Sequence, residues 1–404
     1  MIRHLILCCC LAGSASASAP IIENPADPPV RREVTFTEVW RAGTDEGEEF
    51  LFGVIGDAVC DPAGNIYLLD AQQQCVFKFT SGGEYLGIVS RKGEGPGEID
   101  RVYSLGMLGR DGIAMLKSFP AEVIVVDTAG VPRPGIHPEP PRFWAESVFS
   151  FVTRFENRDG LMVCSGLVSH AMGEVQDQTQ YLASLGPEGD VLHCYGSKRG
   201  GYDFTRPITV DEIGDHSPIQ VWTVGRDGEI YLAPDRDRWL VEVRDAWGGV
   251  LRLITRDWAP HLRTDQEKEK VKDGYSFSSN GQLPPISYRI ADTDPAISSL
   301  GFRNGELWIQ SPDQGRDLPE GVAARYDVFD PAGRLQVERS LRIPFDPQTD
   351  KLIFLDNGWA VVVQAFRSAH LASSADLQIQ EGEKRLDGAD LDAEILEVVV
   401  YRPD

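Results

Sequence analysis

The chain has 404 residues, and its 62 acidic and 39 basic residues give a formal net charge of −23. A nucleic-acid-binding protein needs a basic surface to displace counterions from phosphates, so we expect no nucleic-acid partner for this acidic chain. Hydrophobic residues make up 42% of the sequence, enough for substantial cores, and the 40 glycines and 26 prolines suit a fold with many turns.

Residues 1–19 have the pattern of a cleaved export signal. Arg3 supplies a positive charge, Leu5 to Leu11 an apolar core, and Ala15-Ser16-Ala17 the small residues of a cleavage site. The apolar run is too short to span a bilayer, so we expect a periplasmic or secreted protein with no membrane span. The alternative is a lipid-anchored protein, because the apolar run contains Cys8, Cys9 and Cys10, although the residues before them are not the small ones of a lipoprotein signal.

Two segments precede the repeated part of the chain. Residues 20–32 contain four prolines and mixed charge, which predicts a flexible leader before one large domain at 33–404. Residues 34–40 then form a run of strand formers that leads into the pattern Arg-x-Gly-x-x-x-Gly-Glu at 41–48. The same pattern returns at 91–98, after the fourth strand expected in the first repeat unit, so residues 34–40 also look like a fourth strand.

A polar residue, a glycine and a short run of strand formers occur together six times. Such turns join antiparallel strands, because glycine accepts the positive φ of a tight hairpin. The six turns lie at Ala63-Gly64, Asp111-Gly112, Asp159-Gly160, Asp227-Gly228, Asn304-Gly305 and Asn357-Gly358. A second glycine turn follows each of the first five, so a unit contains four strands. In the first unit they are predicted at roughly 53–60, 65–70, 75–80 and 84–90.

Four-stranded antiparallel units repeated at about 50 residues are typical of a β-propeller, whose sheets surround a central channel. The predicted fold class is therefore all-β, a six-bladed β-propeller. The sixth unit lacks its second turn, because the chain ends soon after the strand at 395–401. We expect residues 34–40 to pair with 395–401, which closes the ring and removes two exposed edges.

The first unit resembles an NHL-type blade in three stretches, which are Gly64-Asn65-Ile66-Tyr67-Leu68-Leu69-Asp70, Val76-Phe77-Lys78-Phe79 and Gly83-Glu84-Tyr85-Leu86-Gly87. Gly93-Glu94-Gly95-Pro96-Gly97-Glu98 is similar to the linker often seen after such a blade. The chain thus resembles the six-bladed propellers related to NHL repeats and to the TolB-like fold, many of them secreted bacterial proteins. The resemblance covers about residues 55–100 closely and the rest only in architecture. It implies a fold that binds other molecules, and no particular activity.

Four cysteines remain after cleavage of the signal, and an even number in an exported protein raises the question of disulfides. Cys60 and Cys75 are expected at opposite ends of the first unit. Cys164 and Cys194 are expected on second and fourth strands, roughly 9.6 Å apart, which is too far for a disulfide. We therefore expect four small buried thiols.

Long insertions are expected on one face of the ring. In a blade, the turns between strands one and two and between strands three and four lie on one face, and these turns are short here. The loops between strands two and three, and the links from one blade to the next, lie on the other face. The latter hold the insertions at 133–147, 169–179, 197–217, 259–295, 311–322 and 365–393. Long loops gathered on one face of a rigid scaffold usually carry binding function, so we expect the ligand on this loop-rich face.

One insertion contains a helix signal. Thr264-Asp265-Gln266-Glu267 is a capping box, and the charged run after it predicts a short helix ended by Gly274. This run suits a solvated helix face. Together with the aromatic stretch 275–288, the helix is also a candidate lid over the channel.

Candidate ligand contacts are the aromatic and basic residues of these loops and of the entry to the second innermost strand. An arginine can hold a carboxylate, and an aromatic ring can stack on a sugar or another ring. Taken one at a time, the same residues are common in packing and in solvated loops. The candidates are Arg101, Tyr103, Trp144, Arg206, His216, Arg238 and Trp239.

Motifs of catalysis are scarce. The sequence has no Gly-x-Ser-x-Gly or His-Glu-x-x-His motif, and the mature chain has no Cys-x-x-Cys pair. Residues 93–97 lack the spacing and following helix of a phosphate-binding loop. The acidic clusters at 292–294 and 387–392 lack the glycine and distal glutamate of a helical calcium loop. No catalytic residue, cofactor or metal is assigned from the sequence.

Two functions stay open. The first is an exported, monomeric, non-enzymatic propeller that holds a peptide, glycan or partner protein on its loop-rich face. The second is a metal-dependent, lactonase-like hydrolase or lyase with its site at the channel axis. Enzymes of that kind resemble one another in having acidic and amide ligands at the inner strand ends. The corresponding positions here supply few such ligands, so we favour the first function. They lie near Arg101, Phe149, Gln220, Ser298 and Lys351.

Overall fold

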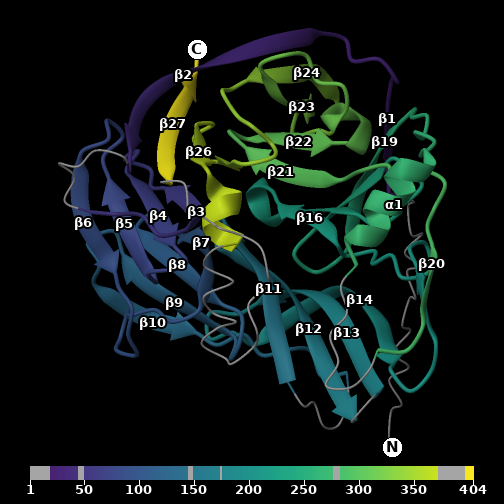
Figure 1. The fold of residues 1–404 in the computed structure, drawn as a ribbon, viewed down its shortest axis with the longest axis horizontal. Coiled ribbons are helices and arrows are strands. Elements are labelled where there is room, and N and C mark those ends of the chain that lie inside the picture. Colours follow the sequence, from purple (N-terminus) through teal and green to yellow (C-terminus); the bar gives the residue numbers. More distant parts are fainter. Residues whose placement is uncertain (1–18, 44–49, 144–148, 173–174, 276–282, 372–395) are drawn as a thin grey trace, which may run out of the picture.

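The computed structural model describes residues 19–43, 50–143, 149–172, 175–275, 283–371 and 396–404 (Figure 1). Over these ranges the chain is all-β, with α1 (Asp265–Asp273) in a connection between strands and a further helical stretch at 366–371. None of the helices in these ranges has the length and apolar character that crossing a bilayer requires.

Antiparallel sheets follow one another along the chain, and Figure 1 shows them arranged around a central axis in a propeller-like way. We number them in chain order. Sheet 1 has β3 (Ile55–Cys60), β4 (Ile66–Asp70), β5 (Cys75–Phe79) and β6 (Tyr85–Ser90). Sheet 2 has β7 (Val102–Leu108), β8 (Gly112–Lys117), β9 (Glu122–Asp127) and β10 (Pro132–Ile136). Sheet 3 has β11 (Phe149–Arg158), β12 (Leu161–Met172), β13 (Val175–Leu185) and β14 (Val191–Asp203).

The second half of the chain repeats this order. Sheet 4 has β16 (Val221–Val224), β17 (Ile230–Ala233), β18 (Leu240–Arg244) and β19 (Val250–Arg256). Sheet 5 has β21 (Ser299–Arg303), β22 (Glu306–Gln310), β23 (Val322–Phe329) and β24 (Leu335–Arg342). Sheet 6 has β25 (Lys351–Phe354), β26 (Ala360–Gln364) and β27 (Glu397–Pro403). A small parallel pair, β15 (Ile208–Asp211) and β20 (Ile286–Arg289), lies in the connections.

The N-terminal segment pairs with three of these sheets. β1 (Ile21–Asn24) runs parallel to β19 of sheet 4. The first part of β2 (Arg31–Ala42) runs parallel to β24 of sheet 5, and its second part runs antiparallel to β27, from Phe36 opposite Pro403 to Ala42 opposite Val398. The pairing expected between residues 34–40 and the C-terminal strand is therefore present. Through β2, sheets 5 and 6 form one eight-stranded sheet.

The segment 20–32 differs from the flexible leader expected from its prolines. Its residues 21–24 form β1, and the side chain of Asn24 is buried between sheets 4 and 5. The Asn24 amide donates to the carbonyls of Thr255, at 3.1 Å, and Gly333, at 3.0 Å, and its oxygen accepts from the Leu335 N–H at 2.7 Å. The open edge of β19 thus orders a segment that has no strong local strand signal.

Sheet 3 differs from the expectation of long loops at 169–179 and 197–217. Strands β12 and β13 pair without a break in register from Met162 opposite Leu185 to Met172 opposite Val175. β14 continues beside them to Asp203, so much of both predicted insertions is strand. The sequence here is polar and does not alternate, which explains why it was interpreted as loop.

Trp40 of β2 packs the N-terminal segment against sheet 1. Its ring stacks on Phe79 of β5, with centroids 5.1 Å apart, and the side chain is 8% exposed. Gly83 lies under the indole with a positive φ of 90°, and a Cβ there would come within 2.6 Å of the ring. The glycine of this turn is thus required both by its backbone and by the tryptophan above it.

The cysteines of the described residues are free thiols, as expected, and Cys60, Cys75 and Cys164 are buried. Cys194 is half-buried, so the expectation of four buried thiols is wrong at this position. Cys164 and Cys194 both lie opposite Ala183, one on each side of β13, so they are two strands apart in one row. This separation is the one predicted from the sequence, and it is too large for a disulfide between the two thiols.

Candidate functional site

A cavity of about 320 Å³ lies where the innermost strands of the sheets meet. We call it the axial cavity. Its walls are Asp57–Cys60 of β3, Ser104–Met107 of β7, Arg154–Arg158 of β11, Thr223 of β16, Leu300–Arg303 of β21, and Ile353–Asp356 at the end of β25. These segments lie mainly toward the strand ends that lead into the short first–second turns. The Asp356 side chain in one such turn is 60% exposed, so the cavity reaches solvent on the short-turn face.

Asp57 joins sheet 1 to sheet 2 in the cavity wall. Its carboxylate accepts from the Leu105 N–H at 2.8 Å and from the Ser104 hydroxyl at 3.0 Å, both on β7, and from its own neighbour Ala58 at 2.9 Å. Burial raises the pKa of the carboxyl, and these donors and Lys351 oppose the increase. Lys351 in turn donates to the Gly56 carbonyl, which links sheet 6 to sheet 1.

Glu156 and Arg154 make the same kind of link from sheet 3 to sheet 4. Glu156 accepts from the Val224 N–H at 2.8 Å and from the Thr223 hydroxyl at 3.1 Å, and it forms an ion pair with Arg154. Arg154 donates to the Trp222 carbonyl at 2.9 Å, and its guanidinium lies 4.6 Å from the centroid of the Trp222 ring. Both charges are therefore satisfied within the protein.

Arg158 crosses the short-turn end of the channel. It donates to the carbonyl of Val224 in sheet 4 and to that of Phe302 in sheet 5, each at 3.1 Å. It also pairs with Asp356 after β25, at 3.2 Å. One side chain from sheet 3 thus contacts three other sheets, and its charge is paired.

Arg303 differs from Arg154 and Arg158 because it keeps one buried nitrogen without a hydrogen-bond partner among the described residues. Its guanidinium lies 4.5 Å from the Phe354 ring centroid and 5.4 Å from those of Trp308 and Tyr326. Burial lowers the pKa of Arg303, although an arginine stays charged at neutral pH. Its Nη1 atom is buried and has no hydrogen-bond partner among the residues that the structure describes. An unsatisfied buried donor costs about 1–3 kcal/mol, so a hydrogen-bond acceptor that reached this atom would be favoured.

The sequence contains a signal for these residues, although none of them is among the predicted ligand contacts. Arg154, Glu156 and Arg158 alternate along one innermost strand, whereas Phe155 between them is buried against the core. Residues at a spacing of two share one face of a strand, so charges at this spacing on an innermost strand face the channel. The positions expected to hold ligands are the starts of these strands, whereas the charged residues lie toward the strand ends.

The predicted arginines of the loop-rich face are exposed, and each pairs with a nearby carboxylate. Arg101 lies 3.2 Å from Asp100, Arg206 lies 3.3 Å from Asp203, and Arg238 lies 3.8 Å from Asp235. Tyr103 is 58% exposed. The structure does not gather these residues into one pocket with the others, and their role in binding stays a prediction.

His216 and Arg238 line one shallow groove. Trp239, which is next to Arg238 in the sequence, does not reach the surface. Trp239 is 4% exposed, stacks near Phe329 with centroids 5.5 Å apart, and donates to the Ser311 hydroxyl at 3.2 Å. A ligand could stack on its ring only after the loop had moved. Trp144 lies outside the described residues.

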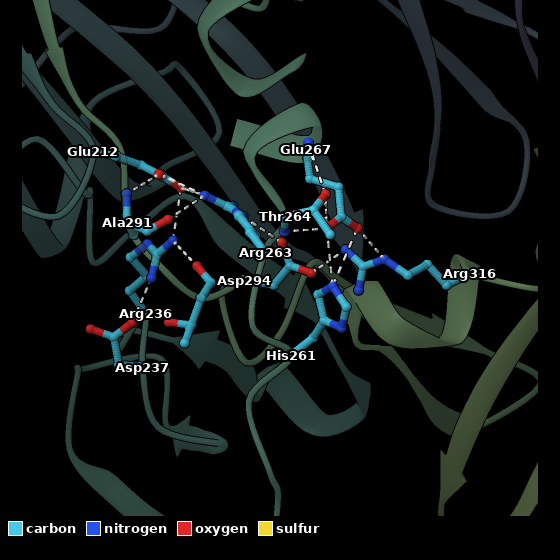
Figure 2. A network of polar contacts seen from close by, with 11 residues as sticks. Glu212, Arg236, Asp237, His261, Arg263, Thr264, Glu267, Ala291, Asp294 and Arg316 are labelled. Carbon is cyan, nitrogen blue, oxygen red and sulfur yellow. Dashed lines mark hydrogen bonds and ion pairs between the residues drawn. The ribbon is translucent and has the colours of Figure 1, made fainter. Parts of the chain in front are cut away.

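The helix signal in the sequence is confirmed. Thr264 and Glu267 form the expected capping box at the start of α1, and Gly274 is its C-cap. A network of ion pairs fixes the helix start to three other loops, and Figure 2 shows these side chains turned toward one another. Hydrogen bonds of Thr264 and the contacts of His261 and Arg316 hold the pKa of Glu267 at about 2. The role of α1 as a lid stays a prediction.

This network leaves little charge for a ligand. Arg263 lies 2.7 Å from both Glu212 and Asp294, and Arg236 lies 2.8 Å from Glu212. Arg316 pairs with Asp294 and, at 3.0 Å, with Glu267 (Figure 2). Each of these guanidinium groups has a carboxylate partner, so the loops around α1 are held together by their own charges.

The described residues contain no group of three or more His, Cys, Asp or Glu side chains that could hold a metal ion. In the axial cavity, Asp57 and Glu156 already accept hydrogen bonds from neighbouring strands, and Asp356 is paired with Arg158. The donor set of the cavity therefore does not fit a metal centre.

No protein-family model matches the chain, and no curated protein matches it either. Among solved structures, a Bacteroides fragilis protein described as exported is 12% identical, with 95% of this chain and 99% of that chain covered and a TM-score of 0.45. The PQQ-bound aldose sugar dehydrogenase of Streptomyces coelicolor is 9% identical, with 94% and 100% covered and a TM-score of 0.41. Virginiamycin B lyase of Staphylococcus aureus is 9% identical, with 82% of each chain covered and a TM-score of 0.36. At these values the likeness does not bear on what this chain binds.

Proposed function

We propose that this chain is an exported six-bladed β-propeller that binds a small anionic ligand in its axial cavity and catalyses no reaction. The sheets would be the blades, and β2 would close the ring by joining the last blade through β27. The pattern at 1–19 supports export with cleavage of the signal. The alternation of strands and glycine turns along the chain supports the number of blades.

The observation that carries the binding function is the guanidinium of Arg303 in the axial cavity, whose Nη1 atom has no hydrogen-bond partner among the described residues. Arg154 and Arg158 in the same cavity are each paired with a carboxylate. Arg303 is held among three aromatic rings and keeps one N–H without an acceptor, which is the arrangement of a preorganised anion site.

A peptide, glycan or protein partner on the loop-rich face stays a second proposal. Its candidate arginines are exposed and paired, so binding there would first have to replace existing ion pairs. The metal-dependent hydrolase or lyase has less support, because the axial cavity lacks a free set of metal ligands.

The test uses residues 20–404 and thermal unfolding in the presence of acetate, phosphate or sulfate at constant ionic strength. We expect at least one of these anions to raise the melting temperature of the wild-type protein but not that of the Arg303→Met variant. Arg238→Met is the matched control, because Arg238 is exposed on the opposite face and its loss should leave the anion effect unchanged. The proposal is wrong if no anion stabilises the wild-type protein, or if Arg303→Met responds equally.

A further inference from the structure

The lining of the axial cavity combines apolar and charged side chains. Apolar side chains come from sheets 1 and 2, with Val59 and Met107, and from sheets 5 and 6, with Leu300, Phe302 and Phe354, and we call these side chains the apolar wall. The charged side chains include Asp57 of sheet 1 and Arg158, Arg303 and Asp356 of sheets 3, 5 and 6. A ligand that fills this cavity therefore meets a cation beside an apolar surface.

From this arrangement we infer that the ligand is a monocarboxylate with an aromatic or branched aliphatic body. Its carboxylate would accept from Arg303, and its apolar body would contact the apolar wall. The inference rests on the proposed function and adds the chemical class of the ligand.

The charges of the cavity favour one negative charge on the ligand. Arg154 pairs with Glu156, and Arg158 pairs with Asp356, which leaves Arg303 to meet the ligand. A second carboxylate or a doubly charged phosphate would have no unpaired cation in the cavity. It would also lie close to Glu156 and Asp356, which repel it.

The hydroxyl groups of the cavity argue against a sugar. The Ser104 hydroxyl donates to Asp57, and the Thr223 hydroxyl donates to Glu156. Both donors are therefore already used, as are the N–H groups of Leu105 and Val224. A glycan would bring many hydroxyl groups into a space that offers them few free partners, and unsatisfied polar groups oppose binding.

The size of the cavity sets the size of the apolar body. An engineered protein cavity of about 150 Å³ holds one benzene molecule. The axial cavity, at about 320 Å³, is roughly twice as large, which fits a ring with a short acidic side chain of about ten to fourteen non-hydrogen atoms in all. 3-Phenylpropionate has this size and charge, and we use it as the probe.

The experiment measures the affinity of residues 20–404 by calorimetry for four compounds. These are 3-phenylpropionate, acetate, glucuronate, and the neutral 3-phenylpropanol. We expect 3-phenylpropionate to bind at least tenfold more tightly than each of the others. Acetate lacks the body, glucuronate replaces it with hydroxyl groups, and the alcohol lacks the charge.

Two variants separate this inference from the proposed function. Met107→Gln should weaken 3-phenylpropionate several-fold and leave acetate unchanged, because Met107 belongs to the apolar wall. Arg303→Met should weaken both. If acetate or glucuronate binds as tightly as 3-phenylpropionate, or if Met107→Gln has no effect on it, the ligand class is wrong and the anion site survives. If no anion binds the wild-type protein, the proposed function itself fails.

Discussion

Replacement of Trp40 by alanine tests whether the N-terminal segment holds the last sheet against the first. Trp40 belongs to β2, yet its ring stacks on Phe79 of sheet 1 and covers Gly83. Truncation of a buried aromatic side chain costs about 3–5 kcal/mol, through lost burial and the cavity left behind. The stacked pair with Phe79 contributes about 0.5–1.5 kcal/mol beyond the buried area. We therefore expect Trp40→Ala to lower the free energy of unfolding by about 3–5 kcal/mol.

The assay is urea unfolding of residues 20–404, followed by far-UV and near-UV circular dichroism. Coincident transitions at the two wavelengths are needed before a single free energy is derived. Trp247→Ala is the control, because Trp247 lies in a turn, is 74% exposed, and should change stability by no more than about 0.5 kcal/mol. Equal stability of Trp40→Ala and the wild-type protein would refute the role of this contact in joining sheet 6 to sheet 1.

Three further predictions concern a histidine, a helix and the thiols. Burial lowers the pKa of His216 below 6.5, so the unfolded chain binds its proton more readily and stability should fall as the pH drops through about 6.5. His216→Gln should reduce this slope in unfolding measured from pH 7.5 to 5.5, and parallel curves would contradict the assignment. Thr264→Ala removes the cap of α1, worth about 1 kcal/mol, and should speed hydrogen exchange of the α1 amides without affecting the central sheets. Equal protection of the α1 amides from hydrogen exchange in the variant and the wild-type protein would contradict this role of the Thr264 cap. Finally, the denatured, unreduced mature chain should give a full thiol count in a colorimetric assay, and a count of zero would show disulfides at Cys60, Cys75, Cys164 and Cys194.

The elements predicted best are those with a local cause. In sheet 1, the expected strands at 53–60 and 84–90 correspond to Ile55–Cys60 and Tyr85–Ser90, because glycine turns and apolar runs mark their ends. The pairing of β2 with β27 was predicted because one repeat lacked a strand and another segment matched it. The capping box at Thr264 is a four-residue signal and needs no tertiary information.

The elements that were missed depend on distant partners. β1 forms because β19 offers an open edge, and nothing in residues 21–24 alone indicates this pairing. Trp239 was expected on a binding surface because it lies in a loop, but a hydrogen bond to Ser311 and contact with Phe329 place it in the core. The axial cavity joins side chains from all the sheets, so the surroundings of Arg303 form only when the sheets come together.

The pairing of the N-terminal segment has a consequence for the order of folding. Asn24 bonds to Gly333, 309 residues later in the chain, and Phe36 lies opposite Pro403 near the C-terminus. Asn24 and Phe36 therefore wait for partners made more than 300 residues later, and contacts of such high sequence separation fold slowly. The early sheets can form beforehand, but the pairing of β2 with β27 can form only after residues 397–403 have been made.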